Sequence, residues 1–292
     1  ETIYEVPMHF AKNELDDIIV EKLHLPNKKL NLETWRNFVR RVRSPRKEVN
    51  IALVGKYVKY RDSYKSIAEA FIHAGAVNNA KVNVKWVDSE KLDPKKFRST
   101  FRNIDGVLVA PGFGSRGVEG KIAAIKYVRE KGIPFFGICL GMQCAVIEYA
   151  RNVCGLKEAH STEFKKNDQN VIDLMPDQRD IKDKGGTMRL GAYPCVVEKN
   201  THAHKAYGKT KISERHRHRY EVNNAFRDTL QENGMVLSGT SPDGRLVEMI
   251  ELKDHPWFVG VQFHPEYKSR AVTAHPLFVD FVKASIKHAG KK

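Results

Sequence analysis

A cysteine between two glycines is the residue of this sequence best placed for chemistry. Residues 137–141 read Gly-Ile-Cys-Leu-Gly, after an apolar run at 133–138 and before a helix-like segment at 142–151. A nucleophile flanked by small residues between a strand and a helix is typical of a nucleophile elbow, in which glycines permit the tight turn. The start of a helix also favours the thiolate of Cys139. The alternative is an unreactive buried cysteine in a glycine-rich turn.

A partner for this thiol follows 125 residues later. Residues 258–266 read as a buried strand that ends in His264-Pro265-Glu266. Positions i and i+2 of an extended segment point the same way, so Glu266 can orient and charge-support the imidazole of His264. A thiol, a base and a carboxylate that holds the base form a triad in its cysteine version. We therefore predict Cys139, His264 and Glu266 as catalytic residues.

Composition excludes several classes of protein. The 292 residues are 41% hydrophobic and 29% charged, which is ordinary for a globular chain. No apolar run is long enough for a membrane span, and the charged N-terminus lacks a signal-peptide core. The four cysteines show no zinc-binding spacing, so we expect no metal and a reducing, cytoplasmic environment. Because the chain begins with Glu1, we expect a piece of a longer protein.

A net charge of +15 raises the question of nucleic-acid binding. Basic residues concentrate at 36–47 and in the Arg-His-Arg-His-Arg run at 215–219. No zinc-finger, KH or RNP sequence accompanies them, so we do not expect a nucleic-acid partner. A solvated or inter-domain face suits the first run. In the second, alternation would place Arg215, Arg217 and Arg219 on one face, where they could bind a carboxylate.

The order of apolar patterns predicts an α/β fold. Residues 1–48 carry two helical patterns, at 15–25 and 32–42, and read as a helical connector after a missing domain. From residue 49, strand and helix patterns alternate and predict a doubly wound, mostly parallel sheet flanked by helices. The predicted strands are 49–55, 82–87, 106–110 and 133–138, and the predicted helices are 64–76, 91–102, 120–131 and the segment after Cys139. We therefore predict a single domain over residues 49–292.

The second half of the chain predicts a smaller antiparallel sheet element. Strand patterns lie at 187–197, 235–239, 245–252 and 258–263, and a closing helix is expected at 276–288. A long polar stretch at about 160–186 has no such pattern. A structureless segment of that length is usually functional, so we expect a loop or lid there.

A glycine-rich turn precedes the cysteine segment. Residues 112–117 read Gly-Phe-Gly-Ser-Arg-Gly, which matches a dinucleotide fingerprint only formally, because the following strand ends in Cys139 and no acidic residue is placed for a ribose. A tight turn can instead expose backbone N–H groups to an oxyanion. We expect the N–H groups of Gly112 and Leu140 to form such an oxyanion hole. No phosphate-binding P-loop is present in the sequence.

These motifs resemble a known family. The segment Gly-Ile-Cys-Leu-Gly-Met-Gln at 137–143 with His264-Pro265-Glu266 is similar to the class I (triad) glutamine amidotransferases, which have a flavodoxin-like fold. Ser-Thr-Glu-Phe at 161–164, Gly-Gly-Thr-Met-Arg-Leu-Gly at 185–191 and the run at 214–223 resemble the CTP synthase family within that class. Residues 3–7 resemble the end of that family's synthetase domain. The resemblance spans essentially the whole chain.

The resemblance implies an activity and further site residues. It implies hydrolysis of L-glutamine to glutamate and ammonia, with Gln143, Glu163 and Arg219 holding the substrate. Arg219 would bind the α-carboxylate, and Glu163 would lie near the ammonium group. One departure is that residues 110–114 read Ala-Pro-Gly-Phe-Gly, where the family usually reads Pro-Gly-Gly-Phe-Gly. Because Pro111 has no N–H, we expect Gly112 to be the remaining donor of this turn.

The resemblance also implies partners outside the chain. A missing N-terminal synthetase half would use ATP and Mg²⁺ to convert UTP to CTP with the ammonia, in a homotetramer. GTP would act as an allosteric activator and would contact Phe113 and the polar segment near 177–186. No cofactor is implied for the chain itself. The alternatives are the amidotransferase domain of another synthetase, a γ-glutamyl hydrolase, or a largely non-catalytic docking module.

Overall fold

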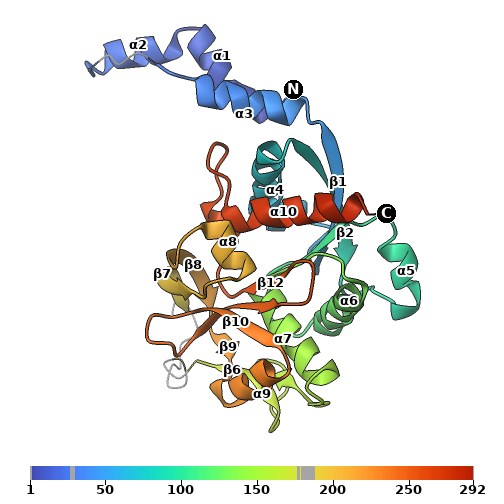
Figure 1. The fold of residues 1–292 in the computed structure, drawn as a ribbon. Coiled ribbons are helices and arrows are strands. Elements are labelled where there is room, and N and C mark those ends of the chain that lie inside the picture. Colours follow the sequence, from blue (N-terminus) through green and yellow to red (C-terminus); the bar gives the residue numbers. More distant parts are fainter. Residues whose placement is uncertain (1, 27–29, 176–177, 179–187, 292) are drawn as a thin grey trace.

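A nine-stranded sheet forms the centre of the computed structural model, which describes residues 2–26, 30–175, 178 and 188–291 (Figure 1). One half of the sheet is parallel, in the spatial order β2 (Ala80–Asp88), β1 (Lys47–Gly55), β3 (Gly106–Val109), β4 (Phe135–Ile138) and β12 (Phe258–Val261). The antiparallel half continues with β11 (Val247–Leu252), β10 (Met235–Thr240), β7 (Arg189–Val197) and β8 (Lys211–His218). The predicted α/β fold is confirmed, and its antiparallel element extends the main sheet.

Helices cover both faces of the parallel half. Alternate residues of β1 divide between the two sides: Ile51 and Leu53 join the core beneath one helical layer, whereas Ala52 and Val54 join the other. The first layer contains α4 (Lys65–Val77) and α10 (Pro276–Ala289), with α8 (His202–Tyr207) beside α10. The second contains α5 (Phe97–Thr100), α6 (Val118–Lys131) and α7 (Leu140–Asn152), with α9 (Arg227–Glu232) beyond α7 (Figure 1). This layering is expected for right-handed βαβ crossovers.

A second, three-stranded sheet corrects the prediction of a structureless stretch at 160–186. It consists of β5 (His160–Ser161), β6 (Asn170–Leu174) and β9 (Tyr220–Val222). Val171 and Ile172 are fully buried, so this short apolar pair holds β6 against the core despite its polar neighbours. Residues 176–177 and 179–187, which include most of the predicted effector segment, lie outside the described residues.

The helix predicted at 91–102 is also wrong in its length. The structure has a 3-10 turn at Pro94–Lys96 followed by α5, and Asp93 caps the turn by accepting a hydrogen bond from the N–H of Lys95. Within this stretch only Phe97 and Phe101 are deeply buried. One buried turn is enough to anchor a short helix but not to extend it. Other 3-10 turns lie at Ile3–Glu5, Arg61–Tyr64, Asn224–Phe226 and Pro265–Lys268.

Three N-terminal helices stand away from the sheet (Figure 1). They are α1 (Val6–Lys12), α2 (Leu15–Lys22) and α3 (Glu33–Arg43), and the last two lie where the sequence predicts helices. Phe38 and Val39 of α3 pack with Ala76 of α4 and with the Tyr4 side chain in a small separate core. None of the described helices is both long and apolar enough to cross a bilayer.

Candidate active site

Cys139 occupies a sharp turn between β4 and α7. Its backbone has φ 52° and ψ −106°, a conformation that costs free energy for a residue with a side chain. Its N–H donates to the carbonyl oxygen of Val261 on the neighbouring strand β12, at 2.7 Å. This hydrogen bond fixes the turn to the sheet, so the thiol lies at the carboxyl end of a central strand, as in a nucleophile elbow.

The two glycines that flank the turn are required by packing. A Cβ on Gly141 would lie 2.1 Å from the carbonyl oxygen of Val109, and a Cβ on Gly137 would lie 2.9 Å from the carbonyl group of Gly141. Both neighbours are backbone atoms, which cannot move aside without disturbing the sheet. The spacing Gly-x-Cys-x-Gly is thus a steric consequence of bringing α7 directly onto β3 and β4.

The imidazole of His264 is held by a carboxylate. His264 follows β12, and its Nδ1 lies 2.8 Å from Oε1 of Glu266, with both side chains almost fully buried. Burial would lower the pKa of His264, but the charge of Glu266 and the interaction with the Cys139 side chain raise it well above its ordinary value. The direction of this shift favours a protonated ring paired with Glu266, and the side chain of Cys139 is the other group that acts on it.

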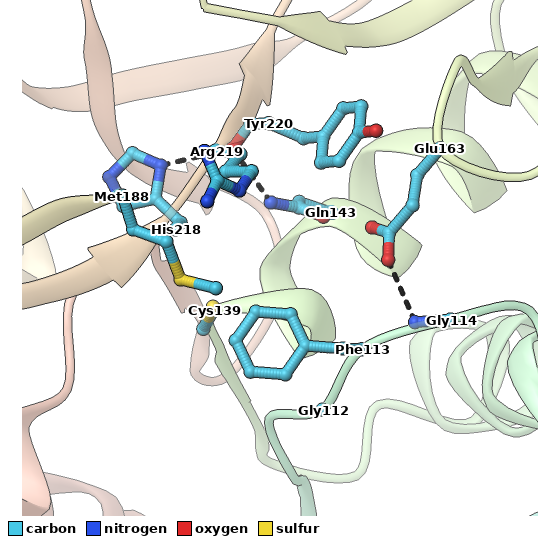
Figure 2. Close-up of a pocket in the computed structure, with 10 residues that line it drawn as sticks. All are labelled: Gly112, Phe113, Gly114, Cys139, Gln143, Glu163, Met188, His218, Arg219 and Tyr220. Carbon is cyan, nitrogen blue, oxygen red and sulfur yellow. Dashed lines mark hydrogen bonds between the residues drawn. The ribbon is translucent and has the colours of Figure 1, made fainter. Parts of the chain in front are cut away.

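Cys139 is only 3% exposed, yet it lines a cavity of about 370 Å³ (Figure 2). Its Sγ lies 3.6 Å from the amide nitrogen of Gln262 and 3.9 Å from the carbonyl oxygen of Arg217. The other residues that line the cavity are Gly112, Phe113, Gly114, Gln143, Glu163, Met188, His218, Arg219 and Tyr220. A small polar ligand can thus reach the sulfur, and the alternative of a sealed cysteine does not fit this geometry.

The glycine-rich turn forms one wall of this cavity. A Cβ placed on Gly112 would lie 3.7 Å from Cδ2 of Leu140, so the two predicted oxyanion-hole residues are neighbours. Glu163 fixes the turn from the cavity side, since its Oε1 accepts a hydrogen bond from the N–H of Gly114 at 2.7 Å (Figure 2). Lys56 donates to the carbonyl oxygen of Phe113 from another side.

The predicted substrate-binding residues converge on the same cavity from different elements. Gln143 lies on α7, Glu163 follows β5, and Arg219 lies between β8 and β9 (Figure 2). The amide nitrogen of Gln143 donates to the carbonyl oxygen of Tyr220 at 2.9 Å and to Oε1 of Gln262 at 3.1 Å. Gln143 is therefore tied into the wall, whereas Glu163 and Arg219 bring opposite charges to the cavity.

The predicted face of three arginines is wrong. Along β8, Arg215 and Arg217 are exposed, whereas His216 and His218 point into the protein. Arg219 lies beyond the strand, is 9% exposed and donates to Gln178. Pairing of β8 with β7 determines which side chains of β8 face the protein interior, and these are the histidines. Because β8 ends at His218, Arg219 does not continue the alternation and faces the cavity.

His218 is a cavity residue that the sequence interpretation missed. Its Nδ1 lies 3.0 Å from the carbonyl oxygen of Tyr220, and burial lowers its pKa to about 3, so the ring is neutral at working pH (Figure 2). Arg217 lies beside the cavity although it is exposed, because its guanidinium lies over the ring of Phe113, 5.5 Å from the ring centre. The alternation of arginine and histidine at 215–219 does not by itself indicate which of the two residue types faces inward.

One group of described residues has donor atoms close enough for a metal ion: His216, His218 and Glu248. A guanidinium already occupies the centre of this group. Nη1 of Arg189 lies 2.7 Å from a carboxylate oxygen of Glu248, 3.3 Å from Nδ1 of His216 and 3.4 Å from Nε2 of His218. These side chains therefore suit a buried cation supplied by the chain itself rather than a metal ion.

Comparisons with known proteins show the family to which this chain belongs. Residues 59–284 match the model of the family described as glutamine amidotransferase class-I, and the chain belongs to that family. Two curated relatives are CTP synthases. That of Chloroherpeton thalassium is 58% identical over 98% of this chain and 52% of its own length. That of Cytophaga hutchinsonii is 56% identical over 100% of this chain and 55% of its own length. The chain thus spans about half the length of these relatives.

A solved structure shows the same fold. The glutaminase domain of Trypanosoma brucei CTPS with bound acivicin is 38% identical to this chain, with a TM-score of 0.77, and the match covers 82% of this chain and 94% of that one. Within the class I amidotransferases, the chain is therefore similar to the glutaminase part of CTP synthases.

Proposed function

We propose that this chain hydrolyses L-glutamine to glutamate and ammonia, with Cys139 as nucleophile, His264 as general acid and base, and Glu266 as the carboxylate that orients His264. The observation that carries the proposal is the pairing of a strained cysteine at a cavity with a buried, carboxylate-bound histidine. Such an arrangement suits thiol-dependent acyl transfer.

In the first half of the reaction the thiolate of Cys139 attacks the side-chain amide carbon of glutamine. The electron pair of the C=O bond moves to oxygen, and the N–H groups of Gly112 and Leu140 bind the resulting oxyanion. The tetrahedral intermediate collapses as the C–N bond breaks, and the imidazolium of His264 gives its proton to the departing ammonia. A γ-glutamyl thioester on Cys139 remains.

In the second half, water attacks the thioester carbon while neutral His264 takes a proton from it. The second tetrahedral intermediate collapses, the C–S bond breaks, and glutamate leaves as Cys139 returns to its thiolate beside the imidazolium. The charge of Glu266 favours the protonated ring of the free enzyme, in which the imidazolium faces the Cys139 thiolate. Glu266 therefore supports the charge-paired form from which each cycle starts.

The charges of the cavity suit the backbone groups of an amino acid. Arg219 offers a guanidinium for the α-carboxylate, and Glu163 offers a carboxylate for the ammonium group. Gln143 would define the space between them. This division of roles favours an α-amino acid with a side-chain amide over a simple amide.

The larger assembly is also part of the proposal. Because curated CTP synthases are about twice as long as this chain, we propose that residues 1–48 connect residues 49–292 to a synthetase half that uses ATP, Mg²⁺ and the ammonia to convert UTP to CTP. Several large apolar side chains of the connector are exposed, which suits contact with such a partner: Ile3, Val6, Phe10, Ile18, Ile19, Leu23 and Leu25. A homotetramer, activation by GTP at Phe113 and a cytoplasmic location stay predictions.

The glutaminase activity can be tested on the chain directly. We expect the wild-type protein to release ammonia from glutamine and to be labelled at Cys139 by acivicin, whereas Cys139→Ala should do neither. Cys154→Ala is the matched control, since Cys154 lies just beyond the C-terminal end of α7, outside the cavity. Equal labelling of wild type and Cys139→Ala would show that the nucleophile lies elsewhere.

A further inference from the structure

A lysine is completely buried behind the glycine-rich turn. Lys121 lies in the first turns of α6 with 0% exposure, and its Nζ donates a hydrogen bond to the carbonyl oxygen of Ala110 at 2.7 Å. Among the described residues, no carboxylate forms an ion pair with it. Burial lowers the pKa of Lys121 to about 8, which shows how unfavourable this environment is for an ammonium group.

The ammonium group lies beside Gly112, one of the two predicted oxyanion-hole residues. A Cβ built on Gly112 would lie 3.8 Å from Nζ of Lys121 and 3.7 Å from Cδ2 of Leu140. The space beside Gly112 is therefore bounded by Nζ of Lys121 and by the side chain of Leu140. The charge of Lys121 also interacts with Cys139 and with Glu163, both of which line the cavity.

The sequence of the turn explains why a donor is needed here. Pro111 follows Ala110 and has no N–H, so the turn has one backbone donor fewer with which to fix itself. Three side chains hold the turn instead: Lys121 at Ala110, Lys56 at Phe113 and Glu163 at Gly114. Lys121 is the one that holds the carbonyl group immediately before Pro111 and Gly112.

Packing alone does not account for a lysine at this position. A methionine has nearly the same length and would fill the space without burying a charge, which is costly without a close counter-charge. A buried positive charge has a function here if it attracts a negative charge that develops in the cavity during the reaction. The low dielectric of the interior strengthens this attraction.

We propose that Lys121 is a positioning residue of the glutaminase reaction: its ammonium group holds the turn at Ala110–Gly112 so that the N–H of Gly112 faces the oxyanion, and its charge supports that oxyanion from behind. The proposal rests on the glutaminase function proposed above. Lys121 does not touch the substrate: it positions Gly112, and its charge acts on the oxyanion from a distance.

The test compares Lys121→Met, which removes the charge and the hydrogen bond, with Lys121→Gln, which removes the charge but keeps a donor. We expect Lys121→Met to lower kcat for glutamine by about 10²-fold, close to the effect of losing one oxyanion donor, with KM changed less than about threefold. Lys121→Gln should lose less than Lys121→Met. Lys131→Met, an exposed lysine in the last turn of the same helix, is the control and should match wild type.

Two further measurements separate positioning from a merely structural role. Alkylation of Cys139 by iodoacetamide forms no oxyanion, so its rate should stay within about threefold of wild type in both Lys121 variants. The melting temperature of Lys121→Met should stay close to that of wild type, because removal of a buried charge and loss of the hydrogen bond to Ala110 act in opposite directions.

The proposal is wrong if Lys121→Met keeps kcat within about threefold of wild type, if turnover and alkylation fall together, or if both Lys121 variants unfold. Failure of the glutaminase function itself would look different, because wild type and Cys139→Ala would then behave alike.

Discussion

Oε1 of Glu266 lies 2.8 Å from Nδ1 of His264, and neither side chain is more than 5% exposed. The pair comes from one short segment, in which Pro265 separates the two residues and begins a 3-10 turn. The sequence predicted this contact from an extended segment, whereas in the structure the 3-10 turn brings the two side chains together. A carboxylate buried at this distance is the main reason that the pKa of His264 is raised despite burial.

We expect Glu266→Gln to lower kcat/KM for glutamine by about 10²–10⁴-fold, because an amide supports neither the imidazolium nor a single tautomer of the ring. The charge of Glu266 raises the pKa of His264, so its removal should lower that pKa and move the alkaline limb of the pH–rate profile to lower pH. Steady-state ammonia release between about pH 6 and pH 10 measures both effects.

The control for this substitution is Glu130→Gln, a carboxylate with a side chain 52% exposed on α6. It should reproduce the wild-type profile. A Glu266→Gln profile that superimposes on wild type would show that the His264–Glu266 pair has no part in catalysis.

Glu163 should act on substrate binding rather than on the chemical step. Burial raises the pKa of its carboxyl group, while the N–H of Gly114 and the charges of Lys56 and Lys121 oppose that rise. We expect Glu163→Gln to raise KM for glutamine about tenfold, since the ammonium group loses its counter-charge. The amide oxygen can still accept from Gly114, so kcat should change much less.

Glu158→Gln is the matched control, because Glu158 lies near Glu163 on the other side of β5 but its side chain is 66% exposed. Its KM should equal that of wild type. If Glu163→Gln instead lowered kcat with KM unchanged, Glu163 would serve the glycine-rich turn rather than the ammonium group.

Gly141 tests the packing of the elbow. Because a Cβ there would come 2.1 Å from the carbonyl oxygen of Val109, we expect Gly141→Ala to lower the free energy of unfolding by about 1–3 kcal/mol or more and to abolish turnover. Chemical denaturation measures the first effect and ammonia release the second.

Gly290→Ala provides the comparison. Gly290 has φ −72° at the end of α10, and its added Cβ would meet its nearest neighbours at an ordinary 3.8 Å. That variant should be as stable as wild type. Equal stability of Gly141→Ala and Gly290→Ala would mean that α7 can move away from β3 at no cost.

The sequence predicted those parts of the site whose geometry is local. The elbow at Cys139 is encoded by two glycines within five residues, and the His264–Glu266 pair by two positions that only Pro265 separates. Long apolar patterns likewise located β1, α4, α6 and α10 to within a few residues. In each case, neighbours in sequence determine the arrangement.

Parts that depend on pairing between distant segments were not predictable. The run at 215–219 is polar at every position, so its sequence does not show whether arginine or histidine faces inward. Pairing of β8 with β7 decides the phase and buries His216 and His218. Lys121 is a similar case, since a lysine on a helix is normally expected to be exposed. Its burial depends on contact with the distant residue Ala110, which the sequence pattern of the helix does not show.

Buried neutral histidines should make the fold sensitive to acid, and His255 offers the clearest test. Burial lowers its pKa to about 4, and the ring contacts the carbonyl oxygen of Val128 and the N–H of Trp257. Below the unfolded pKa of about 6.5 the unfolded chain binds a proton that the folded chain does not, so stability is lost as pH falls from about 6.5 toward about 4. Within that pH range, the free energy of unfolding falls by up to about 1.4 kcal/mol per pH unit.

We therefore expect urea unfolding at about pH 5 and about pH 7 to show a smaller pH dependence for His255→Gln than for wild type, by about 1–2 kcal/mol. The comparison uses the difference between the two pH values, so any stability lost equally at both does not affect it. His9→Gln, an exposed histidine on α1, should keep the wild-type dependence. If His255→Gln and His9→Gln show the same difference between the two pH values, His255 is protonated as readily in the folded chain as in the unfolded one.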